Sequence, residues 1–152
     1  CDKFLESRRL EGENLRKDLL EKMEAMSGLV AQVEEKSPQI IEEYKARLTQ
    51  KIDELMGDRQ IDESRIATEV TLYADKICVD EELVRLKSHI KEMTGALSSA
   101  DAIGRKLDFI VQEMNREVNT IGSKAQDLNI TKIVVDMKAE IEKIREQIQN
   151  IE

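Results

Sequence analysis

Apolar residues recur at intervals of three and four positions along most of this chain, the spacing that places side chains on one face of an α-helix. The first such stripe predicts a long helix and consists of Leu15, Leu19, Met23, Met26, Val30 and Val33. Ser37 and Pro38 then pair a typical helix N-cap with a proline in the first turn. We therefore expect a second helix from there to Gly57, folded back on the first as an antiparallel hairpin.

The rest of the chain predicts four more helices. Asp62 and Asp80 each precede an apolar stripe and are expected at the starts of the third and fourth helices. A break at residues 98–101 precedes a fifth helix over residues 104–124, and a break at 127–131 precedes the sixth. The inward positions of the fifth helix are Leu107, Ile110, Val111, Met114, Val118, Ile121 and Ala125. Those of the sixth form a coiled-coil seam: Ile130, Val134, Met137, Ile141, Ile144, Ile148 and Ile151.

No segment alternates apolar and polar residues as a half-buried strand would, so the predicted fold class is all-α. We expect long antiparallel helices in a bundle with a C-terminal coiled-coil-like helix. Residues 1–60 are assigned to a long helical hairpin and residues 61–152 to a C-terminal helical bundle. The apolar seam of the last helix must be buried against another helix, which is either the first long helix or a helix of a second subunit. We expect a homo-oligomer.

Composition limits the kinds of partner that this chain can bind. The net charge of −8 argues against binding nucleic acid through bulk charge, so any polyanion site must be local. No apolar run has spanning length and no signal sequence opens the chain, which predicts a cytoplasmic protein without a membrane partner. The two cysteines have no metal-ligand spacing, and Cys78, between two apolar residues, is expected to be a buried small hydrophobe. Glycine-rich nucleotide motifs and catalytic-serine motifs are absent.

The polar side of the helix over residues 104–124 is too specialised for ordinary solvated surface. A face that only had to be wet would favour long charged side chains in pairs four residues apart. This face instead carries short or planar groups suited to fixed hydrogen bonds, namely Arg105, Asp108, Gln112, Arg116, Asn119 and Ser123. We expect it to hold a ligand or a partner.

Three features of these helices have both a structural and a functional interpretation. His89, the one histidine, flanks an apolar stripe, where a histidine is more often structural than catalytic. Glu113 and Glu117, four residues apart, suit Mg²⁺ or Mn²⁺, or else form a solvated flank paired with Arg116 and Lys124. Phe109 lies on the polar side, where packing against a neighbouring helix is favoured over stacking on a nucleobase.

The residues that carry these features resemble the YicC/YloC family of bacterial proteins. The resemblance covers GRKLDFIVQEMNREVNTIGSKA from Gly104, DEELVRLKSHI from Asp80, RRLEGENLRKDL from Arg8 and KAEIEKIREQIQNIE from Lys138. It implies a cytoplasmic endoribonuclease that forms a ring-like homo-oligomer, with a hexamer as one form, and depends on a divalent metal, Mn²⁺ or Mg²⁺. The chain resembles the C-terminal half of a family member and opens inside the helix that links the two halves.

The resemblance also implies roles for residues. His89 is the leading catalytic or metal-contacting residue, with Glu113 and Glu117 as its catalytic partners. The other roles come from our first hypothesis, which is metal-assisted cleavage of the RNA phosphodiester. In this hypothesis the expected metal ligands are Glu82, His89, Asp108, Glu113 and Glu117, and the expected contacts to RNA phosphates are Arg85, Arg105, Gln112, Arg116 and Asn119.

The nucleophile remains open between a metal-bound water and the ribose 2′-hydroxyl, and in the second case DNA is inert. Two other functions remain open as well. One is an oligomerisation and RNA-binding scaffold without its own activity, and the other is an adaptor that presents RNA or a ribonuclease to partners.

Overall fold

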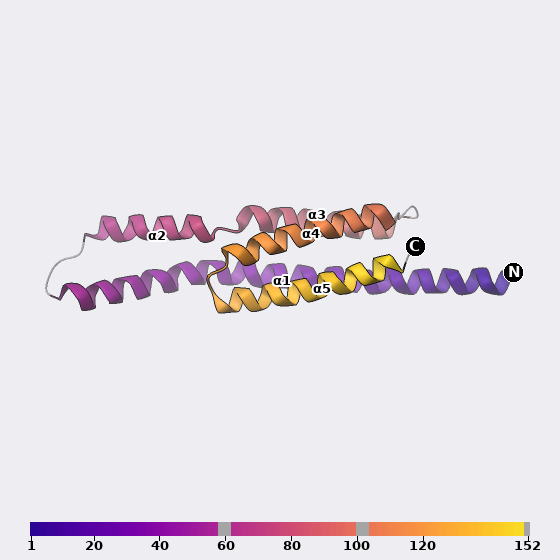
Figure 1. Ribbon diagram of the computed structural model, residues 1–152, viewed down its shortest axis with the longest axis horizontal. Coiled ribbons are helices and arrows are strands. Elements are labelled where there is room, and N and C mark those ends of the chain that lie inside the picture. The colour runs from indigo at the N-terminus through magenta and orange to yellow at the C-terminus, as the bar shows by residue number, and fades with distance from the viewer. Residues whose placement is uncertain (58–61, 100–103, 151–152) are drawn as a thin grey trace.

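The computed structural model describes residues 1–57, 62–99 and 104–150, which are helical apart from short connections, as the sequence predicts. The helices are α1 (Asp2–Met56), α2 (Glu63–Ile77), α3 (Asp80–Ser98), α4 (Gly104–Lys124) and α5 (Leu128–Gln149). Figure 1 shows α1 running the length of the molecule, with α2 beside its C-terminal part and α3, α4 and α5 beside its middle part, while its N-terminal end extends beyond the bundle. None of the described helices is long and apolar enough to cross a membrane.

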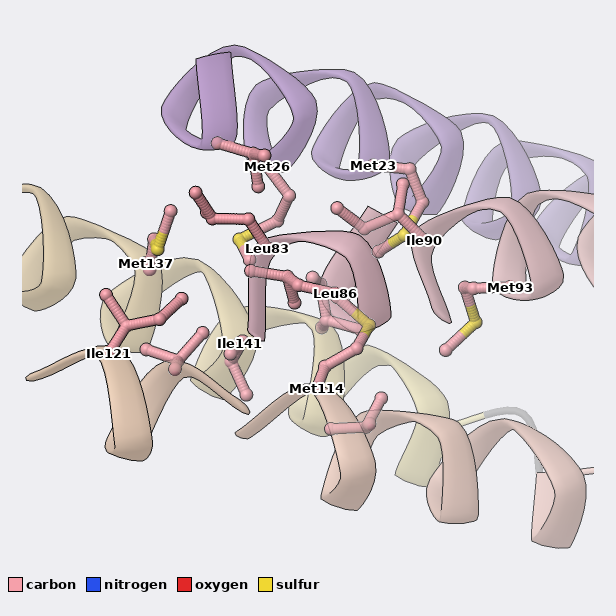
Figure 2. Packing of buried hydrophobic residues seen from close by; sticks show 14 of the residues in the cluster. Met23, Met26, Leu83, Leu86, Ile90, Met93, Met114, Ile121, Met137 and Ile141 are labelled. Carbon is pink, nitrogen blue, oxygen red and sulfur yellow. The ribbon is translucent and has the colours of Figure 1, made fainter. Parts of the chain in front are cut away.

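Helices α1, α3, α4 and α5 form the bundle, and each contacts two of the others. Helix α1 contacts α3 and α5, and α4 also contacts α3 and α5, so that α1 and α4 lie on opposite corners. The apolar seam of α5 is buried by α1 and α4 within one chain. This confirms the first long helix, and not a second subunit, as the helix that buries the seam. Methionine, leucine and isoleucine side chains from all four helices meet in the core (Figure 2).

The helix break predicted at Ser37 and Pro38 is wrong, because α1 continues unbroken through Pro38 to Met56. Ser37 does not cap a new helix; its hydroxyl donates to the carbonyl of Val33 at 2.7 Å. Proline removes one backbone hydrogen bond, but burial of Val33 and Ile40 on either side holds the helix against the bundle. The hairpin predicted within residues 1–60 is therefore absent.

The observed hairpin pairs the C-terminal part of α1 with α2. The rings of Tyr44 and Tyr73 stack across it with centroids 3.7 Å apart. Asp62 caps α2 by accepting from the backbone N–H of Ser64 at 3.1 Å, as predicted. Chain reversal begins at Gly57, whose φ of 59° lies in the region that glycine adopts without steric cost.

The loop between α2 and α3 corrects another prediction. Cys78 is exposed there and its neighbour Val79 is buried. The thiol was expected inside because Cys78 lies between two apolar residues. Helix α2 ends at Ile77, however, and the backbone of Cys78 itself is extended, so that its side chain points outward. Cys78 contributes its carbonyl oxygen instead, which accepts a hydrogen bond from Lys124 at 3.2 Å.

Candidate active site

A pocket of about 500 Å³ lies along the outer groove between α3 and α4. It is open to solvent and brings together several of the predicted site residues. Its lining residues are Arg85, Ser88 and His89 from α3, and Glu113, Arg116, Glu117 and Thr120 from α4. The two helices are antiparallel and pack through their apolar stripes, so the residues that flank those stripes meet along one groove.

Arg85 is held at one end of the pocket by carboxylates. Its Nε donates to Glu117 Oε1 at 2.9 Å, across the two helices. Its terminal nitrogens lie 3.6 Å from Glu81 and 3.7 Å from Glu82. The hydrogen bond to Glu117 and these nearby negative charges hold the pKa of Arg85 above its ordinary value, so the guanidinium stays charged.

Behind Arg85, the buried carboxylate of Glu82 anchors the end of α4. Lys124 Nζ donates to Glu82 Oε1 at 2.6 Å, and Glu82 is 4% exposed. Burial alone raises the pKa of Glu82, but the hydrogen bond from Lys124 and the positive charges of Lys124 and Arg85 outweigh it and lower the pKa below 4.5. The other oxygen, Oε2, is buried without a hydrogen-bond partner among the described residues.

His89 lies in the middle of the groove with its side chain 20% exposed. Its Nδ1 is 3.9 Å from Glu92 Oε2, too far for a hydrogen bond. Arg116 is exposed on the facing helix and forms no ion pair within the part of the chain that the structure describes. A half-buried imidazole thus shares the pocket with an uncommitted guanidinium.

The remaining predicted residues lie outside this pocket. Arg105, Gln112 and Asn119 are exposed farther round α4, and Asp108 accepts a hydrogen bond from Gln112 at 3.1 Å. The polar side of α4 is therefore two surfaces. One faces the groove with α3, and the other faces away from it.

The part of the chain that forms the pocket matches a known protein family. The model of the family "Endoribonuclease YicC-like, C-terminal" matches residues 33–152, a range that contains every residue of the pocket. The chain belongs to the YicC-like family. This agrees with the resemblance carried by the α3 and α4 motifs.

Two relatives extend the match over nearly the whole chain. A protein of Clostridioides difficile (strain 630) named "Probable endoribonuclease YicC" is 48% identical over 151 residues, which is 99% of this chain and 52% of that protein. A protein of Haemophilus influenzae with the same name is 38% identical over 149 residues, or 98% and 51% of the two chains. The chain thus spans about half the length of these relatives.

The expected metal ligands do not gather at one point. Among the described residues, no three histidine, cysteine or acidic side chains lie close enough together to hold a metal ion. Glu117 accepts from Arg85 and Glu82 accepts from Lys124, so the two buried carboxylates already have cationic partners. This donor set, as arranged in one chain, does not fit a divalent ion, and metal dependence stays a prediction.

The pairing of charges also differs from the solvated-flank alternative. Glu117 pairs with Arg85 and Lys124 with Glu82, both across helices, whereas that alternative placed Glu117 and Lys124 together along α4. The pair that Lys124 forms with Glu82 across the helices is the contact that the sequence did not predict. The signal was present, because Glu117 and Lys124 are seven residues apart and occupy the same edge of α4 as it passes α3.

Proposed function

We propose that the pocket between α3 and α4 is the RNA-cleaving site of an endoribonuclease. One observation carries the proposal: the one histidine of the sequence lies in a groove with two arginines and two glutamates from two different helices. Histidine suits proton transfer near neutral pH, and arginine binds phosphate through paired N–H donors. The names of the relatives support RNA as the substrate.

In the reaction we propose, His89 accepts the proton of the ribose 2′-hydroxyl. The 2′-oxygen forms a bond to phosphorus while the bond from phosphorus to the 5′-oxygen breaks, and the leaving oxygen takes a proton from water. Arg116, which has no ion pair among the described residues, neutralises charge that builds on the phosphate oxygens. The products are a 2′,3′-cyclic phosphate and a 5′-hydroxyl, and DNA is not cleaved.

Two other predictions of the resemblance belong to this proposal. A divalent ion, Mn²⁺ or Mg²⁺, would need ligands beyond those that one described chain gathers, for example from RNA phosphate or a second copy. A ring-like homo-oligomer would supply that second copy. Light scattering on the purified protein measures the number of copies, and a chelator measures the need for metal.

The test uses end-labelled single-stranded RNA and the same RNA with one 2′-deoxynucleotide at the cleavage position. We expect cleavage of the first, protection at the substituted position, and a cyclic phosphate on the upstream product. A 5′-phosphate on the downstream product would contradict the proposed nucleophile. Absence of cleavage by an assembled protein, with and without Mn²⁺, would contradict the nuclease and favour the scaffold.

A further inference from the structure

Phe109 is an exposed aromatic ring on the polar side of α4. Its exposed fraction is 60%, so the packing against a neighbouring helix that was favoured from sequence does not occur within the described chain. The other three aromatic residues of the sequence have partners. Tyr44 and Tyr73 stack on each other, and Arg8 lies over the ring of Phe4 at 5.4 Å. Within the described segments, Phe109 makes no aromatic or cation–π contact.

The position of Phe109 relates it to the pocket. Residues 109, 113, 116 and 120 follow one another at intervals of four, three and four, so they form one stripe along α4. Glu113, Arg116 and Thr120 of this stripe line the pocket. The ring therefore begins one helical turn beyond the pocket, roughly 6 Å from Glu113 along the helix axis. A strand whose phosphate occupies the pocket reaches Phe109 with a neighbouring nucleotide.

Two exposed arginines near the ring favour a nucleotide over an apolar partner. Arg105 lies one turn before Phe109 and Arg116 two turns after it, and both are exposed. Neither forms an ion pair within the described residues. Flanking guanidinium groups bind phosphates on either side of a base, while the ring offers a stacking surface. An apolar protein surface placed here would leave both arginines to be desolvated without a partner.

We infer that Phe109 is a stacking platform for an unpaired nucleobase next to the phosphate in the pocket, and that it selects single-stranded RNA. The inference rests on the proposed function, because it places the ring relative to the phosphate that is cleaved. A base inside a duplex is already stacked on its neighbours, so its face is not available to the ring. Single strands and loops present that face.

The first arm of the test measures binding of a short single-stranded RNA by fluorescence anisotropy to the purified protein and its variants. We expect Phe109→Leu to weaken binding about tenfold and Phe109→Tyr, which keeps the ring, to restore it. Phe4→Leu is the matched control, since Phe4 is 66% exposed, lies in the first turn of α1 and does not line the pocket. It should leave the affinity unchanged.

The second arm identifies the base. A series of RNAs carries one abasic nucleotide at each position in turn. At one position, the abasic RNA should bind wild type about tenfold more weakly than intact RNA does. Phe109→Leu should bind this abasic RNA and intact RNA with equal affinity, because removing the base and removing the ring abolish the same contact. Additive losses at every position would overturn the inference. So would unchanged RNA affinity in Phe109→Leu with an altered number of subunits, since the ring would then be a subunit contact.

These outcomes separate the inference from the proposed function. The comparison of Phe109→Leu with abasic RNAs is a double-mutant cycle that measures binding alone. It therefore tests the stacking role even in a protein that does not cleave RNA. If wild type cleaves RNA and the cycle is additive, the stacking role is wrong while the proposed function stands. If the cycle shows one coupled position and no cleavage occurs, the proposed function is wrong and the ring is an RNA-binding residue.

Discussion

Arg85 on α3 and Glu117 on α4 are 32 residues apart in sequence and are joined by a 2.9 Å hydrogen bond from Nε to Oε1. The bond crosses the groove that forms the pocket, and the Glu117 side chain is 8% exposed. A buried carboxylate without this donor would be costly. Arg85 is therefore committed to holding the groove, and Arg116 is the guanidinium in the pocket with no ion-pair partner among the described residues.

We expect Arg116→Ala to weaken RNA binding and to reduce its dependence on salt. Loss of one phosphate contact on a single strand lowers the slope of log affinity against log salt by about 0.7. Arg145→Ala is the matched control, because Arg145 is an exposed arginine on α5, outside the pocket. Anisotropy titrations across a salt series measure the slope, and equal slopes for both variants would contradict a phosphate contact by Arg116.

Lys124→Met should destabilise the bundle, because it leaves the buried carboxylate of Glu82 without its closest cation. We expect the free energy of unfolding in urea to fall by about 2 kcal/mol, a value kept modest because the Lys124 side chain is 35% exposed. Lys143→Met, which removes an exposed pair with Glu140, should cost less than about 0.5 kcal/mol. Adding Glu82→Leu to Lys124→Met should recover part of the loss, and an unrecovered double variant would contradict this account.

The same pair predicts a pH dependence of stability. The pKa of Glu82 is lowered from 4.5 in the folded chain, so its contribution is present above that value and is lost as pH falls through the folded pKa. The pKa of Lys124 is raised from 10.5, so its contribution is present below that value and is lost as pH rises through the folded pKa. Stability of the pair is complete between these two values.

Urea unfolding at neutral pH and at about pH 3 measures how much the free energy of unfolding falls on the acid side. We expect Glu82→Gln to lose less stability than wild type over this interval, since the variant has no carboxyl group at position 82 to protonate. Glu140→Gln, at an exposed pair on α5, should fall with wild type. Identical acid profiles for wild type and Glu82→Gln would contradict a pKa of Glu82 that folding lowers.

Alanine substitutions at two glycines distinguish the effect of helix propensity on stability from the effect of close packing. A Cβ at Gly28 meets no atom within 4 Å, so Gly28→Ala should raise the free energy of unfolding by about 1 kcal/mol. A Cβ at Gly122 meets Val134 Cγ1 at 3.1 Å, between α4 and α5. Gly122→Ala should therefore gain less, since the buried Val134 must move. Equal gains in thermal or urea unfolding would contradict a tight α4–α5 contact at this point.

Periodicity predicts most of the fold because burial in a bundle follows directly from helical spacing. The bounds of α4 match the predicted range 104–124, and six of its seven inward positions are buried, Ala125 being half-buried. Ile151, the last position of the α5 seam, lies outside the described residues. Pro38 misled the prediction because local propensity cannot register that tertiary contacts on both sides of a proline keep a helix intact.

Site residues were harder to predict because they meet across helices. The sequence places Glu113 and Glu117 on one edge of α4, and Arg85 and His89 on one edge of α3, but the relative register of the two helices is a tertiary property. That register decides that Glu117 meets Arg85 and that Glu82 meets Lys124. Asp108 lies outside the pocket for another reason, because five residues separate it from Glu113 and place the two about 140° apart around α4.

The central claim is that His89 transfers the proton in RNA cleavage at the α3–α4 pocket. The most direct measurement compares the single-turnover cleavage rate of end-labelled single-stranded RNA by wild type, His89→Ala and Lys91→Ala, an exposed control on α3, at matched folding stability and subunit number. We predict a rate for His89→Ala about 10²- to 10⁴-fold below wild type, with RNA affinity retained and Lys91→Ala near wild type. A His89→Ala protein that cleaves RNA at the wild-type rate would contradict the claim.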